Sequence, residues 1–235
     1  MKSELLPFSE RLSTNRWFYA LPQLLREHLV SSAELRRMQP GQVLFRRGDP
    51  PCGLYFVLDG ALTAGSVDAG GKESLLTVIE RATWFGEISL FDGLPRTHDV
   101  VAVGNPVLLH VPQEALMSLL DAEPRHWRYF ALLMAQKVRI AFMNADAVSL
   151  LSAAQRLASR LRWIAEGYGG MSAGQNRIRL TQERLAAMLS LSRQTTNQLL
   201  KELESQGIVR LMAGEVQILD MERLRLASAG AAGTL

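Results

Sequence analysis

Side chains able to read the edges of DNA bases recur along one predicted helix near the C-terminus. Arginine can pair with O6 and N7 of guanine, and glutamine or asparagine with N6 and N7 of adenine. The leucines of the segment 193–205 (Leu199, Leu200 and Leu203) fall on its inward side. The opposite side carries Arg193, Gln194, Asn197, Gln198 and Lys201. This polar side therefore fits the major groove of double-stranded DNA.

The surrounding residues predict a frame that would present this helix. Thr181 is a good N-cap for a short first helix, although Arg184 stands where a capping box has glutamate, and Ser192 is a good N-cap for the second helix. Two short helices joined by a tight turn at 190–191 form a helix-turn-helix. The strands expected over 207–211 and 215–219 would form a wing. The hydroxyls suited to phosphate contacts are those of Thr181, Ser192 and Thr195, and Gln182 is a further candidate for DNA binding. The alternative is a helical hairpin that binds nothing.

Charge is divided unevenly along the 235 residues. The net charge is +3, of which residues 1–148 contribute −1 and residues 149–235 contribute +4. A basic excess in the C-terminal third is expected if that part meets a polyanion.

Hydrophobic residues make up 48% and charged residues 21%, which excludes a disordered or collagen-like chain. The sequence contains no apolar run of about 18 residues, so it predicts no membrane-spanning helix. The N-terminus does not resemble a signal peptide.

A single cysteine, Cys52, follows Pro50 and Pro51. One thiol cannot form a disulfide within the chain. The cysteine content therefore favours a reducing, cytoplasmic compartment, with Cys52 as a structural residue beside a turn.

Short β-prone runs separated by Gly, Pro and Asp predict an antiparallel sandwich or barrel. The runs are 42–45, 54–58, 61–67, 75–79 and 100–111, with turns at 59–60 and, as a hairpin, at 68–71. Ahead of them, helical periodicity predicts short helices over 21–29 and 31–38.

A long helical stretch begins at about Pro124. Its apolar residues recur in alternating steps of four and three, namely Trp127, Ala131, Met134, Val138, Ala141, Ala145 and Val148. Such a stripe, over about three heptads, favours a seam between two subunits; the alternative is one face packed on the chain's own core. Phe130 and Leu133 form a second apolar set that could face the β domain. We expect the helix to continue through 149–165, followed by a loop over 167–176.

Two segments, with this helix between them, make the chain resemble the CRP/FNR family of bacterial transcription regulators. Residues 85–97 (FGEISLFDGLPRT) are similar to the family's phosphate-binding cassette, and residues 180–196 (LTQERLAAMLSLSRQTT) to its DNA-reading element. The resemblance covers about residues 15–225. The positions that the family uses for bases fall on Arg193, Gln194 and Gln198. Glutamine at the last two implies an operator different from that of the cyclic-AMP receptor type.

The resemblance implies a small anionic ligand in the β domain. Gly86 would let the backbone approach it, Glu87 would bind a ribose hydroxyl, and Arg96 with Thr97 would bind a phosphate. A short helix starting near Glu87 would point free N–H groups at the anion. The implied ligand residues are Gly86, Glu87, Ile88, Ser89, Arg96, Thr97 and, on the long helix, Phe142. The alternative is an empty domain in which Glu87 and Arg96 pair with each other.

Two departures leave the identity of the ligand open. His98 and Asp99 follow the cassette where the cyclic-AMP type prefers a small residue. Ala141 and Phe142 stand where that type uses hydroxyl residues to hold adenine, and Phe142 could stack on a base without hydrogen-bonding it. Cyclic AMP, cyclic GMP, cyclic di-GMP, another small anion or no ligand all remain open, and no cofactor is certain.

Nothing in the sequence indicates catalysis or a bound metal. It has no nucleophile elbow, no metal-ligand spacing and no P-loop, and the cysteine cluster of iron–sulfur sensors is absent. The histidines that a haem or metal would need are scattered at His28, His98, His110 and His126. We therefore expect no enzyme and no metal site.

The expected fold class is α+β: an N-terminal antiparallel β-roll of the cyclic-nucleotide-binding kind, a long dimerisation helix and a C-terminal winged helix-turn-helix. The expected domains are 1–123, 124–148 and 149–235. The expected function is sequence-specific transcription regulation by a homodimer on a near-palindromic operator, with half-sites about 34 Å apart, gated by a ligand and with RNA polymerase as a further partner. The alternatives are a ligand-binding module that docks on protein and a ligand-independent DNA-binding regulator.

Overall fold

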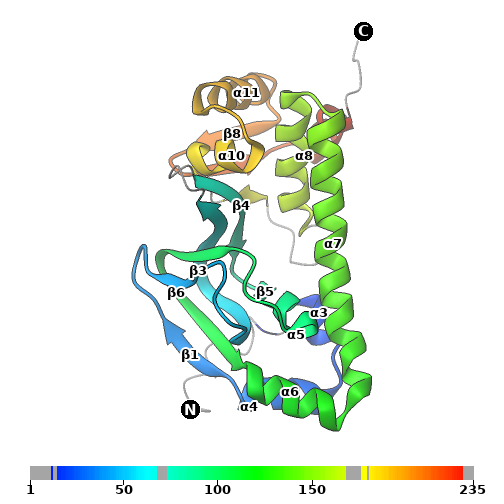
Figure 1. Ribbon diagram of the computed structural model, residues 1–235. Helices are drawn as coiled ribbons and strands as arrows, with labels where there is room; N and C mark the ends of the chain where they lie inside the picture. Colours follow the sequence, from blue (N-terminus) through cyan, green and yellow to red (C-terminus); the bar gives the residue numbers. More distant parts are fainter. Residues whose placement is uncertain (1–11, 13–14, 68–72, 168–175, 179, 230–235) are drawn as a thin grey trace. The chain divides into compact units, whose positions relative to one another are not determined.

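The computed structural model describes residues 12, 15–67, 73–167, 176–178 and 180–229. The chain divides into two compact units, Met1–Lys137 and Val138–Leu235, so the boundary falls inside the long helix α7 (Trp127–Leu150; Figure 1). Each unit is considered by itself.

The first unit is built on an antiparallel sheet. Its order is β1-β6-β3-β4, with β2 paired to β6 and β5 to β3. The strands are β1 (Glu34–Arg37), β2 (Val43–Phe45), β3 (Gly53–Val67), β4 (Glu73–Glu80), β5 (Trp84–Phe85) and β6 (Asp99–Pro112). The predicted antiparallel β-rich fold is confirmed, and the hairpin predicted at 68–71 lies outside the described residues.

Two local expectations in this unit are wrong. Asp59 and Gly60 do not end a strand: β3 continues through them, and its register against β6 shifts there, which is the mark of a β-bulge. The helix expected over 31–38 is replaced by strand β1, whose four residues pair with 107–110 of β6. Hydrogen bonding to an open sheet edge outweighs the weak helical pattern of so short a segment.

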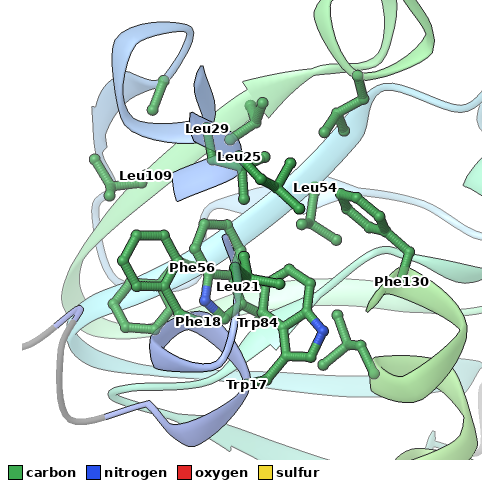
Figure 2. Close-up of a cluster of buried hydrophobic side chains, with 14 of the residues drawn as sticks. Trp17, Phe18, Leu21, Leu25, Leu29, Leu54, Phe56, Trp84, Leu109 and Phe130 are labelled. Atoms are coloured by element: carbon green, nitrogen blue, oxygen red, sulfur yellow. The ribbon is translucent and has the colours of Figure 1, made fainter. Parts of the chain in front are cut away.

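Helices cover one side of the sheet and build the main core with it. They are α3 (Arg16–Tyr19), α4 (Gln23–Ser31), α5 (Ile88–Asp92) and α6 (Gln113–Ala122). Trp17 packs edge-on against Trp84 and Phe130, with ring centroids 5.5 and 5.6 Å apart (Figure 2). The indole Nε1 of Trp17 also donates to the carbonyl of Tyr129, at 2.7 Å. Phe130 and Leu133 are buried in this core, so the first turns of α7 are anchored to the β unit as predicted.

The long helix is interrupted where the sequence predicts continuity. After a 3-10 turn at Pro124–His126, α7 runs from Trp127 to Leu150, and α8 starts at Ala153. Ser152 forms a capping box: its hydroxyl accepts from the backbone N–H of Gln155, whose side chain accepts from the N–H of Ser152. This box satisfies free donors at the start of a new helix, and it explains why the chain does not run on as one helix.

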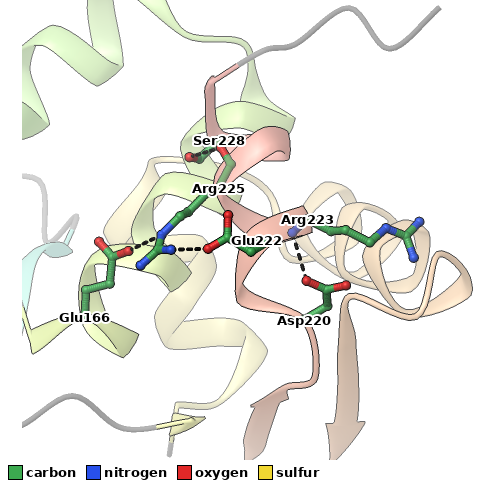
Figure 3. Close-up of polar contacts among 6 residues, drawn as sticks. All are labelled: Glu166, Asp220, Glu222, Arg223, Arg225 and Ser228. Carbon is green, nitrogen blue, oxygen red and sulfur yellow. Dashed lines mark hydrogen bonds and ion pairs between the residues drawn. The ribbon is translucent and has the colours of Figure 1, made fainter. Parts of the chain in front are cut away.

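The second unit combines helices with a small sheet of order β7-β9-β8. Its elements are α8 (Ala153–Ala165), β7 (Arg177–Ile178), α10 (Gln182–Leu189), α11 (Arg193–Ser205), β8 (Val209–Met212), β9 (Glu215–Ile218) and α12 (Met221–Ala229). Arg225 of α12 pairs with Glu166, which follows α8, at 2.8 Å, and with Glu222 (Figure 3). The loop predicted over 167–176 lies almost wholly outside the described residues.

Candidate DNA-reading surface and ligand cassette

Local capping positions the two helices of the DNA-reading element. The hydroxyl of Thr181 accepts from Arg184 N at 3.3 Å, and that of Ser192 from Thr195 N at 3.0 Å. Ser190 ends α10 in the left-handed conformation, with φ 53°, and so turns the chain into α11. The predicted helix-turn-helix and both N-caps are confirmed.

The exposed side of α11 carries most of the residues expected to contact bases. Thr196, Leu200 and Leu203 are buried. Arg193, Gln194, Gln198 and Lys201 are exposed, and Asn197 is half-buried. A shallow depression along the helix is lined by Gln194, Asn197, Gln198, Lys201, Glu202 and Ser205. The structure thus places four of the five predicted base-reading residues around one surface.

The fifth residue, Arg193, lies with the wing. Together with Thr181 and Gln182 it lines a second depression, completed by residues 211–216 of the β8–β9 hairpin. The carboxylate of Glu204 accepts from Leu211 N at 2.7 Å and so ties the wing to α11. The predicted wing is confirmed, whereas Glu204 carried no signal in the sequence.

Gly86 in the cassette adopts a backbone conformation that suits glycine. Its φ is +99°, and a Cβ there would lie 2.8 Å from the carbonyl oxygen of Gly53 and 3.1 Å from Nη1 of Arg96. The missing side chain therefore makes room for the guanidinium of Arg96.

Arg96 is held by the backbone of its own unit. Nη1 donates to Gly86 O at 2.8 Å, and Nη2 donates to Gly53 O at 2.6 Å and to Cys52 Sγ at 3.0 Å. The guanidinium carbon lies 4.5 Å from the ring centroid of Phe45. Only 4% of the residue is exposed, and Nε has no partner. An anion would therefore meet a pre-oriented cation whose two Nη groups already make hydrogen bonds.

Glu87 pairs with the long helix and not with Arg96. Lys137 Nζ of α7 donates to Glu87 Oε2 at 2.6 Å, and Glu87 is 2% exposed. Glu87 and Arg96 therefore do not pair with each other, and the alternative of an internal Glu87–Arg96 ion pair is wrong. Sequence reasoning missed Lys137 because 50 residues separate the partners.

The other expected ligand residues are more scattered. Ser89 is buried, and Ile88 is 45% exposed. Thr97 is exposed, and its hydroxyl lies 2.9 Å from Nδ1 of His98. Phe142 belongs to the second unit and is 66% exposed. The carboxylate of Asp99, which follows the cassette, accepts a hydrogen bond from the backbone N–H of Arg47 at 2.7 Å.

His110 gives the first unit a predicted pH dependence. The ring is 5% exposed, its Nε2 lies 2.7 Å from Cys52 O, and it stacks on Tyr55. Burial is the main cause that lowers the pKa of His110; the nearby Arg36 lowers it too, whereas Glu34 and the Cys52 carbonyl act against the shift. The unfolded chain therefore takes up the proton first as the pH falls below about 6.5.

We expect stability to be greatest above that pH and to fall as the pH drops towards the folded-state pKa, by at most about 1.4 kcal/mol per pH unit for this residue. Thermal melts of wild type and His110→Gln at pH 7.5 and 5.5 would measure this. The variant should lose less stability than wild type between the two. An equal loss would assign the pH dependence to other groups, such as His98 and His126, whose pKa values burial also lowers.

No group of three or more candidate metal-ligating side chains occurs among the residues the structure describes. In the same part of the chain, no helix is long and apolar enough to cross a membrane.

Known proteins match both units. The cyclic nucleotide-binding domain family matches residues 35–123, and the Crp-like helix-turn-helix domain family matches residues 155–227. A Mycobacterium tuberculosis protein described as a CRP-like cAMP-activated global transcriptional regulator is 29% identical over 200 residues, covering 82% of this chain and 89% of that one. The Cyclic AMP receptor protein of Thermus thermophilus is 31% identical over 185 residues, covering 78% and 83%. The structure of FixK2 from Bradyrhizobium japonicum superposes with TM-score 0.75 at 19% identity, over 85% and 99% of the chains, which supports the fold.

A cyclic nucleotide-binding domain followed by a helix-turn-helix defines a DNA-binding transcription regulator. The chain belongs to the CRP/FNR family, as its sequence resemblance predicts. The family is one of transcription regulators and not of enzymes.

Proposed function

We propose that this regulator works as a homodimer on a near-palindromic operator, and that a cyclic nucleotide in the cassette changes its affinity for that operator. The observation that carries the proposal is the Glu87–Lys137 ion pair, which joins the cassette to α7. A ligand hydroxyl that bonds Glu87 would act on the helix that also carries the apolar stripe. Such a ligand shifts the protein only if it binds the DNA-competent arrangement more tightly.

The dimer is supported by the exposure of the second part of the stripe, from Val138 to Val148, in the single chain. Val138, Ala141, Ala145 and Val148 are exposed, whereas Phe130 and Leu133 on another side of the helix are buried. We therefore keep residues 124–148 as the dimerisation segment, between a ligand domain over 1–123 and a DNA-binding domain over 149–235. RNA polymerase is the proposed further partner, and the cytoplasm the proposed location.

Cyclic AMP is the first ligand to test, because the two relatives described above are named for it. Ala141 and Phe142 offer no hydroxyl to adenine, so cyclic GMP and cyclic di-GMP belong in the same titration. A ligand-independent regulator is the second candidate, and it is favoured by the protein partners that Arg96 and Glu87 already have.

Calorimetry and DNA-binding anisotropy together test the proposal. We expect one cyclic AMP per subunit and a changed affinity for selected DNA. Glu87→Gln should weaken ligand binding about tenfold, since a charge-assisted bond becomes a neutral one. Lys137→Ala should still bind the ligand but transmit less of its effect to DNA. If the folded protein binds none of the three nucleotides, the second candidate replaces the first.

A further inference from the structure

An acidic side chain lies among the base-reading residues of α11. Glu202 is exposed and lines the same depression as Gln194 and Gln198. A carboxylate on a surface that meets DNA phosphates weakens binding through repulsion. Among the described residues, Glu202 has no ion-pair partner, so its charge does not serve a salt bridge there.

The side-chain contact of Glu202 is with Gln198. Nε2 of Gln198 donates to Oε1 of Glu202, one helical turn later, at 3.2 Å. The nearby acid Glu204 has a different partner, because its carboxylate accepts a hydrogen bond from the backbone N–H of Leu211 in the wing. The carboxylate of Glu202 is therefore directed along the reading surface, towards a residue expected to touch a base.

The hydrogen bond to Glu202 fixes which way the side-chain amide of Gln198 is turned. A free amide can rotate by half a turn and exchange its acceptor oxygen with its donor nitrogen. An ionised carboxylate only accepts, so Glu202 can bond Nε2 and not Oε1. In this orientation Oε1 and the second hydrogen of Nε2 are left for another partner.

The oriented amide matches one base better than the others. In the major groove, adenine offers a donor at N6 and an acceptor at N7, whereas guanine offers acceptors at both O6 and N7. Oε1 with one N–H can bond both groups of adenine. Guanine O6 would face the amide oxygen and the nearby carboxylate, unless the amide turned over and lost its bond to Glu202.

We propose that Glu202 is a positioning residue that orients Gln198 and so selects adenine against guanine at one base pair of each half-site. The proposal rests on the operator binding proposed above. The negative charge of Glu202 lowers the overall affinity for DNA, and this loss accompanies the gain in selectivity for adenine.

Selection from random double-stranded DNA with the full-length protein tests this role. Wild type should recover a near-palindrome in which one position prefers adenine and loses that preference in Gln198→Ala. Glu202→Gln, which can donate as well as accept, should reduce the adenine-to-guanine ratio at that position about fivefold or more, the low end for a bidentate base contact. All other positions should be unchanged.

The matched control is Glu114→Gln, which removes the same charge from an exposed residue of α6 in the first unit and should retain the wild-type motif. If Glu202→Gln recovers the wild-type motif at every position, the positioning role is wrong while operator binding stands. If Glu114→Gln shows the same loss of discrimination, the effect is one of net charge and the proposal is also wrong. If wild type recovers no motif, operator binding itself fails and the proposal fails with it.

Discussion

Gly53→Ala should destabilise the first unit by about 4 kcal/mol or more, because strain and overlap act together there. Gly53 begins β3 with φ +117°, a conformation unfavourable for alanine. A Cβ would lie 2.1 Å from Val111 O and 2.8 Å from Gln113 N. Both atoms are backbone and cannot rotate away. Total stabilities are about 5–15 kcal/mol, so this loss would leave the unit marginal.

Urea unfolding followed by circular dichroism measures the effect, with Gly93→Ala as the matched control. Gly93 also has a positive φ, +66°, but a Cβ there has no atom within 4 Å, so its cost should be about 1 kcal/mol. The cassette should weaken with Gly53→Ala as well, because Gly53 O accepts from Arg96. Equal stability of the two variants would contradict the close approach of β3 and β6 at this point.

Val138→Glu should cost at least about a hundredfold in affinity for a palindromic site, because a dimer engages two half-sites and a monomer only one. Val138 lies in the stripe of α7 and is 42% exposed in the single chain. A carboxylate there would face its copy across the proposed seam. The slope of log affinity against log salt should also fall by about half, since half of the phosphate contacts are lost.

Analytical ultracentrifugation and anisotropy at several salt concentrations would follow both effects. Arg139→Gln is the matched control, because it changes the net charge by the same amount at an exposed neighbour outside the stripe. It should remain a dimer. A Val138→Glu protein that is dimeric and binds DNA with the wild-type slope would show that the seam lies elsewhere.

Short-range signals explain why so much of the DNA-reading element could be predicted. Its N-caps join Thr181 to Arg184 and Ser192 to Thr195, three residues apart. Its buried positions follow the helical period. The capping box at Ser152 is also a short-range signal, because its Ser-x-x-Gln pattern is visible in the sequence and marks the start of a new helix.

The ligand cassette shows the opposite case. The residue types of the cassette predict an anion site, but they do not predict the hydrogen-bond partners of Arg96 and Glu87. Arg96 reaches Cys52 and Gly53, 44 and 43 residues away, and Glu87 reaches Lys137, 50 residues away. Such pairs depend on how β3, β5 and α7 pack, which no local pattern encodes.

Local patterns in the amino-acid sequence predict the order of the parts: a β-rich domain, a long helix with an apolar stripe, and a winged helix-turn-helix with its exposed polar side. These follow from periodicity and capping, which act between residues a few positions apart. Three other features depend on long-range packing: 34–37 is an edge strand, Arg96 is held by backbone carbonyls, and Glu87 pairs with α7. Arg96 and Glu87 are buried, and burial makes an unpaired polar group too costly to leave, so each is held by whichever distant partner the packing brings to it.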